Sequence, residues 1–184
     1  MKRLFVAILI LGVVLIGLGG AGTAQAATKG EIDRDVEAAL ENLYKSSPGA
    51  KELGKQAKGI LVFPKVLKGG FIFGGQYGEG ALLKNGETAG YYNTVAASYG
   101  LQIGAQVFGY ALFFMSDEDL AYVEGSSGWE IGSGPTVVVA DAGMAGAFTT
   151  TTVRKGVYAF FFSQKGLMAG LGLQGTKISK MKRP

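Results

Sequence analysis

The chain has 184 residues with 18 basic and 14 acidic side chains, and its formal net charge of +4 is too small to indicate a nucleic-acid-binding protein. It contains no cysteine and no histidine, which excludes disulfides, Ser-His and Cys-His nucleophile systems and the ordinary zinc sites. Its 31 glycines occur among 48% hydrophobic residues and only four prolines, a composition unlike collagen or a disordered linker.

Residues 1–26 have the pattern of a secretory signal peptide. Its parts are a positive start, an apolar run and a small-x-small cleavage site, which are Lys2-Arg3, Leu4–Leu18 and Ala24–Ala26. Cleavage would leave Ala27 first and lower the net charge to +2. We therefore expect an exported protein, periplasmic or extracellular, whose residues 27–184 form a single domain with a short basic C-terminal tail.

An uncleaved membrane anchor is the alternative for this segment. Leu4–Gly22 carries no charge, and its 19 residues approach the roughly 20 that a spanning helix needs. We favour cleavage because the run is rich in glycine towards its end and the A-x-A site follows it.

Two helices are expected at the start of the mature chain. Thr28 and Glu31 have the spacing of a capping box, which predicts an amphipathic helix over about Lys29–Lys45. Ser47-Pro48 then predicts an N-cap and a first-turn proline for a shorter helix that ends near Ala57.

Five lysines follow on consecutive elements. On the second helix Lys51, Lys55 and Lys58 lie within about 40° of one another, opposite the apolar positions. Gly59–Phe63 is an apolar strand candidate that Pro64 should stop, and the expected loop after it carries Lys65 and Lys68. Lysines near an anionic surface contribute about 1 kcal/mol each, so the five are candidate ligands for lipid headgroups. A solvated helix face and loop is an equally good interpretation.

The middle of the chain predicts strands and one short helix. Asn85-Gly86 is a strong two-residue turn signal and should join Gly70–Lys84 to Glu87–Ala97. Ser98–Met115 alternates as a half-buried strand. Ser116 and Asp119 should cap a helix over Asp117–Glu124, and its three acidic residues are better explained by capping and solvation than by a cation site.

The last part of the chain predicts strands at Thr136–Ala140 and Ala147–Val153 and then a hairpin over Val157–Gly175. If Gln164–Gly166 forms a three-residue turn, Phe160 lies opposite Gly170 and Tyr158 opposite Gly172, so that rings cover glycines. The last three strands should then form an antiparallel meander.

No catalytic site is indicated. Gly170–Gly175 spells G-x-G-x-x-G but lacks the βαβ context and the acidic residue of a dinucleotide site. Ser163 and Lys165 flank a turn position that breaks the strand on which they would have to cooperate. We expect a protein without enzymatic activity, cofactor or metal.

The segments AKGILVFPKVLKGGFIFGGQYGEGALL, ASYGLQIGAQVFGYALFF and VYAFFFSQKGLMAGLGLQGTKI together resemble the SYLF domain family of lipid-binding proteins, over roughly Ile32–Ile178. The resemblance implies an α+β fold with N-terminal amphipathic helices, one short internal helix and a glycine-rich antiparallel β core, barrel- or sandwich-like. Eukaryotic members are associated with phosphoinositide membranes and in part with actin, and bacterial members are exported. The positions that match are Lys58, Gly59, Pro64, Lys65, Lys68, Gly70, Ser163, Lys165 and Gly166.

The sequence departs from the family pattern at two places. The first mature helix is acidic where eukaryotic relatives have a basic amphipathic segment, and Tyr91-Tyr92 stands where many relatives have tryptophan. The resulting expectation is a non-catalytic module of the bacterial cell envelope that contacts an anionic phospholipid or membrane surface. The alternative is a structural or protein-binding envelope module that uses exposed aromatic residues and the basic tail, Lys177–Arg183, to reach an envelope protein.

Overall fold

The computed structural model describes residues 27–70, 73–99, 104–125, 128–140, 155–166, 173 and 175–182. The predicted signal peptide, the predicted strand Ala147–Val153 and residues 167–172 of the predicted last hairpin lie outside these residues. The expected pairings of Phe160 with Gly170 and of Tyr158 with Gly172 therefore also lie outside them.

The predicted helix starts are confirmed by their caps. The described helices are α2 (Lys29–Ser46), α3 (Pro48–Gln56) and α4 (Asp117–Glu124). At α2 the Thr28 hydroxyl accepts from the Glu31 N–H at 3.3 Å, and the Glu31 carboxylate accepts from the Thr28 N–H at 2.7 Å. The Glu31 carboxylate also accepts from the Thr28 hydroxyl at 2.8 Å, and the two hydrogen bonds that it receives from Thr28, the backbone one foremost, hold the pKa of Glu31 below its ordinary value. Ser47 caps α3 by accepting from the Ala50 N–H at 3.3 Å.

One acid of α4 has more than a capping role. The Ser116 hydroxyl accepts from the Asp119 N–H, as expected for an N-cap. The Asp119 carboxylate, which is buried, accepts from the Ser116 hydroxyl at 2.5 Å and from the Gly156 N–H at 2.9 Å. Asp119 therefore joins the start of α4 to the turn before the strand at Val157, whereas Asp117 and Glu118 are exposed.

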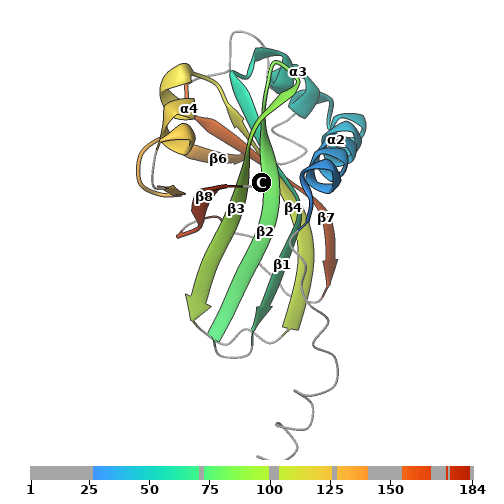
Figure 1. Ribbon diagram of the computed structural model, residues 1–184, viewed down its shortest axis with the longest axis vertical. Helices are drawn as coiled ribbons and strands as arrows, with labels where there is room; N and C mark the ends of the chain where they lie inside the picture. Colours follow the sequence, from blue (N-terminus) through green and yellow to red (C-terminus); the bar gives the residue numbers. More distant parts are fainter. Residues whose placement is uncertain are drawn as a thin grey trace, which may run out of the picture.

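The eight strands that the described residues contain form one curled sheet in the order β5-β8-β3-β2-β1-β4-β7-β6 (Figure 1). Their bounds are β1 (Gly59–Gly70), β2 (Phe73–Lys84), β3 (Glu87–Tyr99), β4 (Gly104–Phe114), β5 (Trp129–Glu130), β6 (Val137–Ala140), β7 (Val157–Gly166) and β8 (Lys177–Met181). The described pairs are antiparallel except β6 with β7. This arrangement confirms the predicted α+β class with a β core. The predicted Asn85-Gly86 turn is also confirmed, with φ of 53° and 83° at its two residues.

The predicted end of the first strand at Pro64 is wrong. β1 continues to Gly70, and its register shifts by one residue against both neighbours between Val62 and Val66. Proline has no N–H to give to a ladder, and a bulge is one of the few places where a sheet accepts it. The lysines at 65 and 68 therefore lie on a strand and not on a loop.

The predicted turn at Gln164–Gly166 is also wrong. These residues continue β7, in which Lys165 pairs with Val107 and Gly166 with Gln106. The described partners of β7 are β4 and β6, so β7 does not sit in the predicted meander. Ring cover of a glycine does occur, but Phe162 provides it to Gly109 across the β4–β7 pair, where an added Cβ would collide with the ring. Lys177 and Lys180, predicted to be part of a tail, belong to β8.

The two faces of the sheet bury separate cores. The inner face packs Leu61, Phe63, Val66, Phe108 and Tyr110 with residues of α4 and β5. Burial raises the pKa of Tyr110, whose hydroxyl donates to Thr94 at 2.6 Å. On the outer face Val62, Ala81 and Phe113 pack under α2 and α3, which lie beside one end of the long strands (Figure 1).

Substitution of Gly80 tests how tightly the β1 bulge is packed. A Cβ at this position would collide with the Val62 carbonyl oxygen and approach Phe63 Cδ1 to 2.8 Å. Overpacking of this kind costs about 1–3 kcal/mol, so Gly80→Ala should lower the free energy of unfolding by that amount in urea. Gly75→Ala on the same strand is the control, since its Cβ would lie 3.7 Å from Ala96 O and no loss of stability is expected. Equal stability of the two variants would show that the bulge is not packed as described.

Substitution of Asp119 tests the hydrogen-bonded link between α4 and the turn before β7. Asp119→Ala removes the acceptor of the buried Gly156 N–H, and an unsatisfied buried donor costs about 1–3 kcal/mol. Asp117→Ala, in the same helical turn but exposed, should change the free energy of unfolding by no more than about 0.5 kcal/mol. The comparison is made by urea unfolding at neutral pH, and an Asp119→Ala variant as stable as Asp117→Ala would contradict the assigned role.

Candidate functional site

The five predicted lysines do not converge on one site. Lys51 and Lys55 lie one turn apart on the exposed side of α3, and Lys58 is exposed just before β1. Lys65 lies further along β1, roughly 20 Å from Lys58 at the usual rise of a strand. The first three thus form one basic group, which we call the α3 lysines although Lys58 lies just beyond the end of that helix. Lys65 and Lys68 lie towards the other end of the sheet.

The two lysines of β1 also point to opposite faces. Lys65 pairs with Glu79 on the outer face and is exposed. Lys68 pairs with Gln76 and Gln106, which are buried on the inner face, and the Gln106 Oε1 has no hydrogen-bond partner among the described residues. A flat lipid surface that contacts Lys65 therefore cannot contact Lys68.

Lys55 has a carboxylate beside it. Its Nζ lies 2.6 Å from a Glu52 oxygen, and both side chains are mostly exposed. Exposed ion pairs of this kind contribute about 0–1 kcal/mol and exchange readily with other partners, so Lys55 remains able to bind an anion. Within the described residues Lys51, Lys58 and Lys65 form no ion pair.

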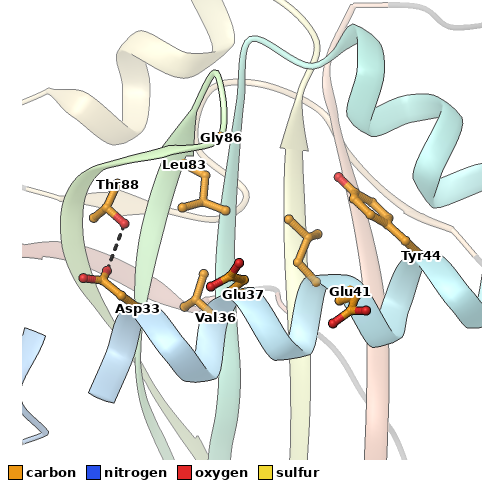
Figure 2. Close-up of a pocket in the computed structure, with 9 residues that line it drawn as sticks. Asp33, Val36, Glu37, Glu41, Tyr44, Leu83, Gly86 and Thr88 are labelled. Atoms are coloured by element: carbon orange, nitrogen blue, oxygen red, sulfur yellow. Dashed lines mark hydrogen bonds between the residues drawn. The ribbon is translucent and has the colours of Figure 1, made fainter. Parts of the chain in front are cut away.

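A groove of about 410 Å³ lies between α2 and the tip of the β2–β3 hairpin (Figure 2). Val36, Leu40, Tyr44 and Leu83 provide its apolar part. Its acidic residues come from successive turns of α2 and are Asp33, Glu37 and Glu41. Sequence reasoning recognised these acids but missed the groove, because Leu83 and Thr88 reach it from a hairpin about fifty residues away in the chain.

The groove is negatively charged at neutral pH. The Asp33 carboxylate accepts from the Thr88 hydroxyl at 2.9 Å and from the Tyr91 hydroxyl at 2.8 Å. Burial, and then Asp33, raise the pKa of Tyr91, and burial raises the pKa of Tyr44 to about 12. A hydrogen bond from Lys45 lowers the pKa of Glu41. With ionised carboxylates and neutral phenols, this groove repels lipid phosphates and suits a cation that carries apolar groups.

The described residues contain no group of three or more acidic, cysteine or histidine side chains that could hold a metal ion. Ser163 and Lys165 are exposed on β7, with Ser163 at φ 55° beside the β4–β7 register shift. Among the helices that the structure describes, none combines the length and the apolar character needed to cross a bilayer. The absence of catalysis and of a metal stays a prediction.

The comparisons with known proteins concern the second half of the chain. Residues 95–183 match the model of a family described as Ysc84, the Las17-binding protein actin regulators. The matched stretch runs from the end of β3 to the end of β8 and includes β4 and β7. No curated protein matches the chain. This match confirms, over residues 95–183, the resemblance to the SYLF domain family that the glycine-aromatic segments indicated.

Proposed function

We propose that this protein is a non-catalytic module of the bacterial cell envelope that binds anionic phospholipid headgroups through exposed lysines. The observation that carries the proposal is a set of exposed lysines without an ion-pair partner among the described residues. Lys51, Lys58 and Lys65 are exposed and form no ion pair in the described part of the chain. Each lysine near an anionic surface contributes about 1 kcal/mol, so several of them can hold a peripheral protein on a membrane.

The family supports a binding role in general. Its members are described as Las17-binding actin regulators, which is protein binding. The resemblance to the SYLF domain family implies lipid binding as well. The proposed cellular place rests on the signal-peptide pattern of residues 1–26, which would deliver the mature chain to the periplasm or the exterior. The protein works there as a peripheral membrane component.

A second candidate function is protein binding without lipid affinity. The observation that favours it is the acidic groove beside α2, which is apolar along its floor and of the wrong sign for lipid phosphates. A basic, apolar segment of an envelope protein has the complementary chemistry. The two functions differ in their response to vesicles, because only the first requires anionic lipid.

Export predicts the start of the mature protein. Intact-mass measurement on protein recovered from the envelope should give a chain that begins at Ala27, because the A-x-A site ends at Ala26. Recovery of the full chain with Met1 from the same fraction would contradict cleavage and favour an anchored form.

Lipid binding predicts selectivity for charge. In flotation assays the mature protein should bind vesicles of phosphatidylglycerol and phosphatidylethanolamine and should not bind phosphatidylcholine vesicles. Binding should weaken as added salt shortens the Debye length. The α3 triple variant, in which Lys51, Lys55 and Lys58 are replaced with Glu, should bind more weakly. It should still fold, because the buried side of α3, with Ala50 and Leu53, is unchanged.

The basic C-terminus needs its own control. Truncation is unsuitable because Lys177 and Lys180 belong to β8, so Lys182 and Arg183 are replaced with Glu instead. Wild-type binding by the α3 triple variant, together with loss of binding in the C-terminal variant, would exclude the α3 lysines as the headgroup site. Absence of binding to any anionic vesicle would refute the lipid function as a whole.

A further inference from the structure

Among the described residues, helices cover only one end of the outer face of the sheet. Helices α2 and α3 lie over one end of the long strands, and β1 to β4 extend well beyond them (Figure 1). Alternation along the strands decides which side chains this bare part presents. On β2 the outer positions are Phe73, Gly75, Tyr77 and Glu79, followed by Ala81 under the helices.

An apolar row crosses the bare part on four neighbouring strands. Val95 pairs with Tyr77, Tyr77 with Leu67, and Leu67 with Val107, so their side chains share the outer face. The exposed fractions are 44% for Val95, 47% for Tyr77 and 53% for Leu67. With strands about 4.8 Å apart, the row is about 14 Å wide. We call these four residues the outer row.

The strand ends beyond the outer row stay apolar and small. The next outer positions across the same four strands are Ala97, Gly75, Gly69 and Ala105. Phe73 follows on β2 and is 75% exposed. Contiguous apolar surface of this extent on a soluble protein usually marks an interaction site, whereas single exposed apolar residues need no explanation.

Lysines stand at both ends of the outer row. Lys177 on β8 pairs with Val95, and Lys165 on β7 pairs with Val107, and both are exposed. Lys65 lies in the adjacent row towards the helices. Two acids are nearby: Glu79 pairs with Lys65 and accepts from the Tyr77 hydroxyl at 2.7 Å, and Glu130 pairs with Lys177 on the edge strand β5. The outer row itself and the small row below it contain no carboxylate.

An anionic bilayer matches this pattern best. Apolar and aromatic side chains can enter the boundary between headgroups and acyl chains, while flanking lysines extend to the phosphates. A second copy that packed its own outer row on this one would set lysine against lysine, whereas a bilayer supplies phosphates to all of them. The acidic α2 protrudes from the same face, so the bilayer must be approached with the Phe73 end of the strands foremost and α2 inclined away from the lipid.

We propose that the outer row, together with Phe73, is the surface that docks on an anionic phospholipid bilayer, with Lys65, Lys165 and Lys177 as its headgroup ligands. This inference rests on the proposed lipid function and moves the main contact from the α3 lysines to the bare end of the sheet. Insertion of apolar side chains into the bilayer then adds a contribution to the binding free energy that salt does not screen.

The test compares two matched double variants. The variant with Leu67→Thr and Tyr77→Thr replaces the two central side chains of the outer row with threonine, a residue that strands favour. Val139→Thr with Tyr122→Thr removes an aliphatic and an aromatic side chain of similar exposure, 49% and 50%, elsewhere on the surface. Circular dichroism and melting temperature establish that both variants fold. Partitioning onto phosphatidylglycerol–phosphatidylethanolamine vesicles is then measured at physiological and at high salt.

We expect the outer-row variant to lose about tenfold or more in partitioning, which corresponds to the burial of two apolar side chains, and the control variant to bind as the wild type. Replacing Lys165 and Lys177 with Gln should weaken binding and reduce its salt dependence. Wild-type partitioning of the outer-row variant, with loss in the α3 triple variant, would overturn this inference and leave the lipid function intact.

Two other results would also overturn it and have different meanings. If the wild-type protein binds no anionic vesicle, the lipid function fails together with its docking surface. If sedimentation shows a dimer that only the outer-row variant dissociates, while vesicle binding is unchanged, the bare face is an interface between copies of this chain.

Discussion

The one-residue register shift in β1 is the constraint on which the rest of the structure depends. Phe63 faces the inner core, and a regular strand would next turn Lys65 inward and Val66 outward. The extra residue at Pro64 reverses this alternation, since a shift of one residue moves every later side chain to the other face. Val66 thereby packs in the inner core beside Phe108, and Lys65 and Leu67 reach the outer face.

The outer face of the sheet divides into two zones, one under the acidic helix α2 and one flanked by lysines. Under α2 the outer positions are apolar and buried, and α2 itself carries the carboxylates around the groove. Beyond α2 come the charged pair Lys65 and Glu79 and then the outer row and the small row, which are apolar, with lysines on the flanking strands. A molecule with this distribution has a preferred orientation at an anionic surface, because its acidic helix and its lysine-flanked rows respond oppositely to lipid phosphates.

Local signals in the sequence predicted the local structure well. The capping box at Thr28, the Ser47-Pro48 start and the Asn85-Gly86 turn each depend on residues within four positions, and all three are present. Pro64 misled because both neighbouring strands hold it in a bulge, and Gln164–Gly166 misled because pairing with β4 keeps them in a strand. The outer row was out of reach for the same reason: Val95, Tyr77, Leu67 and Val107 meet only through the registers of three strand pairs.

The depth of single positions in the bilayer tests the central claim most directly. The chain has no cysteine, so a spin label can be attached at one introduced cysteine at a time, at position 67 on the outer row or at position 51 on α3. On phosphatidylglycerol–phosphatidylethanolamine vesicles, power saturation with oxygen and a water-soluble nickel complex reports the depth of each label. The label at 67 should move below the phosphates and the label at 51 should stay above them. A label at 51 in the headgroup layer with the label at 67 still in water would contradict the account.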